Sequence, residues 1–243
     1  MTAARPSSEP LPTKGILALA APLVLSFWFR SAFQWIDTIY ASTLEGLGDA
    51  SIAAIGLILP FEFLMIACWV GSSNALTSRL SAAMGAGEDE RFEQLLVAAR
   101  RLVHLLCVAF LLLAAGIWFG TPHVGLDPEL GHQFRVYGTM LLAGSAFTTF
   151  WSILPDSIVK AHHDTRSTMW AGIASTVVNV VLNTLFVFVF HWGIAGIALA
   201  TVLGRLGGLV YAQGRAKALE AQRRAGERTP VGGTFDAPLR ALL

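Results

Sequence analysis

One long apolar stretch decides the fold of this chain. It runs from Thr168 to Gln213 and reads TMWAGIASTVVNVVLNTLFVFVFHWGIAGIALATVLGRLGGLVYAQ, with Arg205 as its only charged residue. A helix needs about 20 apolar residues to cross a bilayer, so the stretch is too long for one crossing and must fold back. The segment His191-Trp192-Gly193 is the best candidate for the turn. The sequence therefore predicts a tight hairpin of two membrane helices.

The composition extends this prediction to the whole chain. Of 243 residues, 54% are hydrophobic and 14% are charged, and the formal net charge is +1. Soluble domains carry about 25% charged residues, and these values also exclude a disordered chain and a basic nucleic-acid-binding protein. We expect an all-α polytopic membrane bundle of six transmembrane helices. The spans are placed at Ile16–Ser42, Ser51–Met84, Leu102–Phe119, Phe134–Val159, Thr168–Phe190 and Ile194–Gln213.

Basic residues gather on one side of these spans. They precede the first span, lie between the second and third and between the fourth and fifth, and follow the sixth, whereas the opposite loops hold only Arg135. Loops rich in Lys and Arg stay in the cytosol, so both termini are predicted to be cytosolic in a multi-pass protein of the inner (cytoplasmic) cell membrane. Residues 1–13 are expected to form a cytosolic tail, residues 14–215 the membrane lobe, and residues 216–243 a cytosolic linker.

Four oxygen-bearing side chains are predicted to lie in one layer of the membrane. Counting about 1.5 Å per residue from the outer span ends gives Asp37, Asn183 and Thr201 similar depths. Asn179 lies one turn deeper than Asn183 on the same helix face. A carboxylate, two amides and a hydroxyl suit an alkali cation, and a desolvated carboxylate can equally take a proton. The alternative is that the amides and the hydroxyl only hold the helices together.

Two further ionisable residues lie at membrane depth. Arg30 and Glu62 are at matching depths on adjacent antiparallel spans, so they can form an intramembrane ion pair that neutralises both charges. A structural pair is favoured over contact with a substrate. Glu62 follows Pro60, which can kink the second span.

No pattern in the sequence indicates catalysis or metal binding. Cys68 and Cys107 lie within apolar runs, and the pair His162-His163 lacks the further ligands that a metal site needs. Signatures of phosphate loops, nucleophile elbows and zinc helices are missing from the sequence. We therefore expect a protein that is not an enzyme, with no catalytic residues, no metal and no cofactor apart from a coupling ion.

With these features in place, the sequence resembles the multidrug and toxic compound extrusion (MATE) family of the multidrug/oligosaccharidyl-lipid/polysaccharide flippase superfamily. Four segments carry the likeness, and the pair formed by Asn179–Asn183 and Gly193–Thr201 is the most specific of them. The others are Ala21-Pro22 with Trp35–Tyr40 and Gly46–Gly48, Ala53–Leu57 with Pro60 and Gly71–Gly87, and Lys160–Arg166.

The resemblance implies one lobe of a two-lobed transporter. Family members have two six-helix lobes with a substrate cavity between them, and this chain matches the N-terminal lobe. Asp37, Asn179, Asn183 and Thr201 match the positions proposed to bind the coupling ion, H⁺ or Na⁺. Some members have a second carboxylate where this chain has Asn183, which leaves the choice of ion open.

The function implied is a cation-coupled secondary antiporter that exports drugs and other xenobiotic amphipathic compounds. Its expected partners are a small amphipathic or cationic substrate, the lipid bilayer, and a second lobe or a homodimer partner, with no nucleic acid. The alternatives are a lipid-linked oligosaccharide flippase of the same superfamily and a non-transporting, truncated membrane module.

Overall fold

The computed structural model describes residues 16–225, and all of its regular secondary structure in this range is helical. The helices are α1 (Ile16–Ser42), α2 (Gly48–Ala86), α3 (Asp89–Gly120), α4 (Pro128–Trp151), α5 (Ile153–Ala161), α6 (Thr165–Thr184) and α7 (Gly193–Arg224). A short 3-10 turn, Thr121–His123, follows α3, and a π-helical turn, Leu185–Val189, extends α6. The prediction of an all-α membrane bundle is confirmed.

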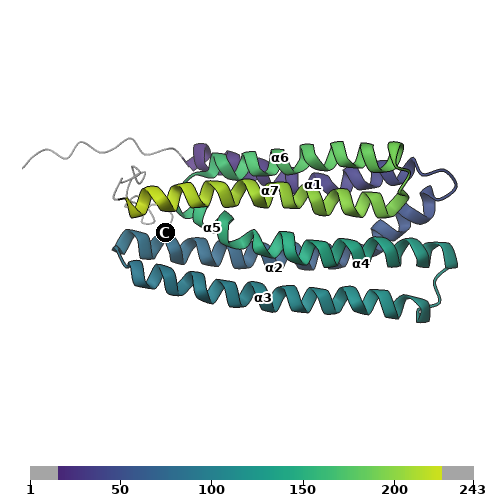
Figure 1. Cartoon of the computed structure of the whole chain (residues 1–243), viewed down its shortest axis with the longest axis horizontal. Helices are drawn as coiled ribbons and strands as arrows, with labels where there is room; N and C mark the ends of the chain where they lie inside the picture. Colours follow the sequence, from purple (N-terminus) through teal and green to yellow (C-terminus); the bar gives the residue numbers. More distant parts are fainter. Residues whose placement is uncertain (1–15, 226–243) are drawn as a thin grey trace, which may run out of the picture.

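Six long helices run along one axis, and α5 is the short exception (Figure 1). By length and hydropathy, four of the described helices qualify as membrane spans: α2, α3 with its 3-10 turn, α6 with its π turn, and α7. The other two long helices, α1 with 27 residues and α4 with 24, also exceed the length of about 20 residues that a crossing needs.

The helices form two groups that α4 joins. α6 packs against α1 and α7, while α4 packs against α7, α2 and α3. In Figure 1, α1 begins and α7 ends at the same end of the bundle, which we call the terminal end. The α1–α2, α3–α4 and α6–α7 connections lie at the opposite end, which we call the far end.

The predicted hairpin in the decisive stretch is present. The turn between α6 and α7 contains His191 and Gly193, whose φ angles of 53° and 55° lie in the left-handed region. Glycine adopts this region at little cost, whereas a histidine there needs support from its surroundings. The backbone N–H of Trp192 donates to the carbonyl of Phe186 at 2.9 Å, and the two rings stack at 4.8 Å. These contacts close the tight turn between the two helices.

The fourth predicted span, Phe134–Val159, is not one helix. α4 ends at Trp151 and α5 begins at Ile153. Pro155 explains the break, because proline has no N–H to donate to the carbonyl of Trp151 four residues earlier, and its ring crowds that carbonyl. After the break, α5 packs against α2 and α7 with nearly all of its residues buried.

Two helices extend well beyond the apolar segments that the sequence delimits. α3 begins at Asp89 rather than at Leu102, and α7 continues to Arg224, into residues that were expected to start a linker. Ion pairs join these polar extensions: Arg224 contacts Glu93 at 2.9 Å, and Arg223 is paired with Asp89. The predicted tail, residues 1–13, and residues 226–243 of the predicted linker lie outside the described residues.

Candidate functional site

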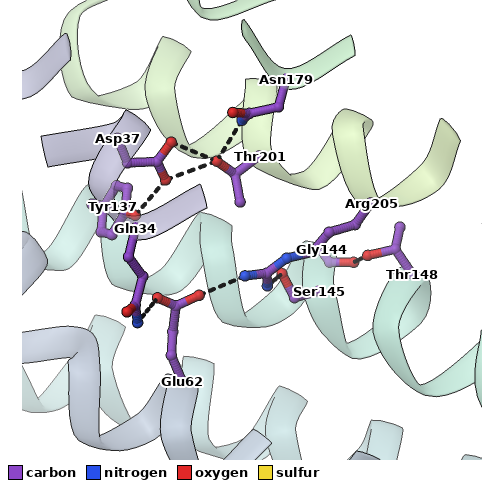
Figure 2. Close-up of polar contacts among 10 residues, drawn as sticks. All are labelled: Gln34, Asp37, Glu62, Tyr137, Gly144, Ser145, Thr148, Asn179, Thr201 and Arg205. Carbon is purple, nitrogen blue, oxygen red and sulfur yellow. Dashed lines mark hydrogen bonds and ion pairs between the residues drawn. The ribbon is translucent and has the colours of Figure 1, made fainter. Parts of the chain in front are cut away.

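Asp37 on α1 is the centre of a buried polar cluster between four helices. The hydroxyl of Thr201 on α7 lies 2.8 Å from Asp37 Oδ1 and 2.7 Å from Oδ2. The hydroxyl of Tyr137 on α4 donates to Oδ2 at 2.8 Å, and Asn183 Nδ2 on α6 donates to Oδ1 at 3.3 Å. Figure 2 shows the Tyr137 and Thr201 contacts converging on the carboxylate. Every donor to this carboxylate among the described residues is a neutral group.

The structure brings together all four residues that the depth count selected. Asn179 completes the set, because its Nδ2 donates to Thr201 Oγ1 at 3.0 Å. Asp37 and Thr201 are each 1% exposed, and the two asparagines are fully buried. We refer to Asp37, Asn179, Asn183, Thr201 and Tyr137 as the Asp37 layer.

Two oxygens of this layer have no hydrogen-bond partner among the described residues. They are the side-chain carbonyl oxygens of Asn179 and Asn183. A buried carbonyl without a partner costs about 1–3 kcal/mol, so an unpaired oxygen in a buried site needs an explanation. The carboxylate, the Thr201 hydroxyl and these two amide oxygens are all hard oxygen donors, the ligand type that binds alkali and other hard cations. No cluster of three or more His, Cys, Asp and Glu side chains suitable for a metal occurs in residues 16–225.

Sequence reasoning missed Tyr137. Tyr137 lies three residues inside the predicted fourth span, Phe134–Val159, and an aromatic residue close to a span end is usually an interfacial anchor. The usable signal was depth: Tyr137 lies within α4, past the first two turns from Pro128, and so reaches the level of Asp37. In the structure its ring is completely buried.

A second buried carboxylate, Glu62 on α2, lies next to the Asp37 layer. Arg205 Nη2 on α7 donates to Glu62 Oε1 at 2.6 Å, and Gln34 Nε2 on α1 donates to Oε2 at 3.0 Å. Arg205 also donates through Nη1 to the hydroxyl of Ser145 on α4. We refer to Glu62, Arg205, Gln34 and Ser145 as the Glu62 layer, whose contacts Figure 2 shows beside those of Asp37.

The sequence analysis paired Glu62 with Arg30. The side chain of Arg30 lies outside the described residues, and the partner that the structure provides for Glu62 is Arg205. For Glu62, depth was compared only with the adjacent first span, and Arg205 was not counted among the ionisable residues at membrane depth. The helix order in space, with α4 between α2 and α7, brings Arg205 to Glu62.

Glycines on α7 set the spacing that lets the two layers form. A Cβ added at Gly204 would lie 2.8 Å from Asn179 Cβ and 2.9 Å from the carbonyl oxygen of Ser175. Only a residue without a Cβ fits this contact, and such close approach is the usual role of small residues between membrane helices. Because α6 and α7 meet here, Asn179 reaches Thr201 across the helix pair.

A separate group of ion pairs lies at the terminal end of the bundle. Arg215 Nε on α7 donates to Asp164 Oδ2 at 2.6 Å, and His162 contacts Glu220 at 2.8 Å. Burial raises the pKa of Asp164, but hydrogen bonds from Ser167 and Arg215 outweigh burial and hold that pKa below its ordinary value. These pairs tie the α5–α6 connection to the polar extension of α7.

Comparison with known proteins agrees with this architecture. The family model described as MatE matches residues 22–185. The chain is 26% identical to a probable multidrug resistance protein, YpnP, from Bacillus subtilis (strain 168), over 82% of this chain and 45% of that protein.

Solved structures show the same fold. A MATE structure in the bent conformation matches with a TM-score of 0.70 and 23% identity, covering 93% of this chain and 49% of the other. A MOP superfamily transporter from Pyrococcus furiosus matches with a TM-score of 0.69 and 23% identity, covering 92% and 48%. The chain therefore spans about half the length of the proteins that it resembles.

Proposed function

The chain belongs to the MatE family, the multidrug and toxic compound extrusion transporters, and from this premise we propose that it is one lobe of a cation-coupled antiporter. The observation that carries the proposal is the state of Asp37. It is a buried carboxylate whose donors in the described residues are all neutral, and the two asparagines of its layer have amide oxygens without a partner in these residues. A buried charge is costly unless it is paired, so the site favours a cation or a proton.

The coupling step uses the Asp37 layer as a switch. Asp37 binds Na⁺ or H⁺, and the side-chain oxygens of Asn179, Asn183 and Thr201 complete the site for Na⁺. Since these groups come from α1, α6 and α7, a change in their spacing changes the affinity for the ion. An ion can shift a conformational equilibrium only through its different affinities for the two states. Binding on one side and release on the other then supplies the free energy for export of a second compound.

The Bacillus relative is named as a probable multidrug resistance protein, and we propose that the exported compound is an amphipathic, often cationic, xenobiotic. Its binding cavity requires more than this chain contributes, because the relatives are about twice as long. We propose a second six-helix lobe, or a second copy of this chain, as the partner across the cavity. Light scattering of the purified chain in detergent distinguishes a dimer from a monomer.

The terminal end of the bundle faces the cytosol in this proposal, and the membrane is the cytoplasmic membrane. The support comes from the basic side chains on the polar extensions of α3 and α7, including Arg91, Arg215, Arg223 and Arg224, all of which lie toward the terminal end. Arg135, the single basic residue of the far-end loops and flanks, stacks on Trp118 at 3.8 Å. Labelling of cysteines introduced at Glu93 and Glu45 with an impermeant reagent in intact cells tests this orientation.

The experiment that tests the coupling role compares Asp37→Asn with Asp49→Asn. Both changes remove one carboxylate, but Asp49 is exposed at the start of α2. The purified chain is melted over a range of NaCl concentrations and pH values. We expect cation-dependent stabilisation in the unmodified chain and in Asp49→Asn, and none in Asp37→Asn. If Asp37→Asn keeps the full cation dependence, the assignment is wrong.

Export is tested in cells that express the chain with a fluorescent lipophilic cation, ethidium, as the substrate. Efflux driven by an imposed ion gradient supports the antiporter proposal, and Asp37→Asn is expected to abolish it while Asp49→Asn preserves it. Gradient-independent efflux, or efflux that Asp37→Asn does not change, contradicts the proposal.

A further inference from the structure

The Glu62 layer shares three of its four helices with the Asp37 layer. α1, α4 and α7 contribute to both, while α6 belongs to the Asp37 layer and α2 to the Glu62 layer. On α1, Gln34 lies one turn before Asp37, and on α7, Arg205 lies one turn after Thr201. Residues three or four apart lie on the same helix face. A movement of α1 against α7 therefore acts on both layers at once.

Arg205 has two sets of acceptors within its surroundings. One set is Glu62 and Ser145, which it contacts now. The other consists of hydroxyl groups on α4 and α6, including those of Thr148, Thr149 and Ser175. Together with Arg205, these residues line a small cavity of about 50 Å³. A cavity of this size holds about one or two water molecules. The guanidinium thus has hydroxyl-bearing side chains on a second side, across a small cavity that it lines itself.

The charge on Asp37 affects which position Arg205 prefers. Arg205 and Glu62 both lie close enough to Asp37 for their charges to act on it. While Asp37 carries its negative charge, it attracts the guanidinium and helps to hold it in the polar layer. When a bound cation neutralises Asp37, this attraction is lost. Separating a buried pair completely is strongly unfavourable, so the change we expect is a weaker contact, with Arg205 displaced toward the cavity but still near Glu62.

Resting on the proposed function, we propose that the ion pair between Glu62 and Arg205 is a coupling element that relays occupancy of the Asp37 layer to α2. With the layer empty, Arg205 ties α7 to α2 through Glu62. With the layer occupied, Arg205 shifts toward the hydroxyl-lined cavity and its contact with Glu62 on α2 weakens. Glu62 and Arg205 are positioning residues in this scheme, because they act through the packing of α2 and not through contact with the cation.

Cys68 supplies a native reporter for this movement. It lies on α2, little more than a turn and a half beyond Glu62, and its thiol is half-buried against the core. The buried Cys107 on α3 donates to the carbonyl of Ala146 at 3.1 Å. Comparison with a Cys68→Ala variant separates the labelling of the two cysteines. The rate of reaction of Cys68 with N-ethylmaleimide therefore reports how tightly α2 is packed.

The test measures two responses of the full chain in nanodiscs to NaCl at constant ionic strength. The first is the cation-dependent shift in melting temperature, which reports occupancy of the Asp37 layer. The second is the labelling rate of Cys68, expected to rise about fivefold or more on occupancy if the coupling lies in the usual range. In Glu62→Gln, and in the double variant Glu62→Gln with Arg205→Gln, we expect the melting response to persist and the labelling response to fall below about twofold.

The outcomes separate the two proposals. Loss of both responses from Asp37→Asn supports the cation site, whereas absence of any melting response in the unmodified chain overturns the proposed function. If the Glu62 variants keep the full labelling response, the coupling proposal is wrong and the pair is structural. Where the single variants do not accumulate, the double variant decides, since it leaves no unpaired charge. Recovery of the labelling response by the exchange Glu62→Arg with Arg205→Glu is the expected rescue, and its absence from a folded exchange variant counts against the proposal.

Discussion

Two carboxylates, Glu62 and Asp37, are buried in the interior of this bundle, and their hydrogen-bond donors differ in charge. Glu62 is bound by the guanidinium of Arg205 and the amide of Gln34. Asp37 is bound by two hydroxyls and one amide, all neutral. Both are 1% exposed, so burial does not distinguish them. The two sites differ in countercharge. Glu62 is paired with a cationic side chain of the same chain, whereas Asp37 has only neutral donors among the described residues.

The largest effect on stability is expected when the cationic partner of Glu62 is removed. Arg205→Met leaves Glu62 as a buried charge without its partner, which costs about 3–5 kcal/mol. The double variant Glu62→Met with Arg205→Met removes both charges and is expected to recover most of that loss. Chemical denaturation in mixed micelles measures the three stabilities. A single variant as stable as the unmodified chain would contradict the assigned pairing.

Removing the carboxylate that lacks an internal cation should have the opposite effect. Asp37→Asn eliminates the cost of burying a charge, so we expect no loss of stability in cation-free buffer. What it loses is the stabilisation by the bound cation, about 2.7 kcal/mol when the ion is at one hundred times its dissociation constant. Melting curves with and without the cation check both parts. Equal cation dependence in the variant and the unmodified chain would refute the contrast between the two carboxylates.

The spacing of α6 and α7 underlies both layers, and Gly204→Ala tests it. The added Cβ would crowd Asn179 and the carbonyl of Ser175, and such overpacking costs about 1–3 kcal/mol. Because Asn179 is displaced, we also expect weaker cation-dependent stabilisation. Gly214→Ala is a matched control, since nothing lies within 4 Å of a Cβ at that position of α7. Equal behaviour of the two variants would show that α7 does not depend on this contact.

A third carboxylate, Asp164, extends the comparison to the terminal end, where water reaches the pair. Its partner Arg215 is 41% exposed, so Arg215→Gln is expected to cost no more than about 1 kcal/mol. The pKa of Asp164 is lowered, so its stabilising contribution is present above the ordinary pKa of 3.8 and is lost as the pH falls through the lower folded value. The difference in melting temperature between variant and unmodified chain should therefore vanish in acid. A difference that persists unchanged at the acid end would contradict the pairing.

Much of the candidate site was accessible from the sequence. A carboxylate within an apolar helix stands out because its burial is costly, and counting residues from span ends is reliable where a helix has a constant rise. Asp37, Asn179, Asn183 and Thr201 were found in this way, and the structure brings them together. The family resemblance and the six-helix architecture are confirmed.

The missing contacts share a physical cause. Depth places a residue along the membrane normal, but it does not say which helices are neighbours or which way a side chain points around its helix. Arg205 was overlooked because the depth of Glu62 was compared only with the adjacent first span, and Tyr137 because it lies close to the start of its predicted span. The break at Ser152 was missed for another reason: hydropathy continues through Pro155, and the effect of the proline is local and steric.

The sequence by itself determined that this chain crosses a membrane as a helical bundle, because apolar stretches of that length have no other stable arrangement in lipid. It also determined which residues are too polar for their depth and therefore need partners. Only the tertiary structure decided which side chains those partners are. The packing of α4 between α2 and α7, and the close approach of α6 and α7 at Gly204, gave Glu62 an arginine and left Asp37 with neutral donors. That difference arises from helix neighbours and rotation, which composition and periodicity do not encode.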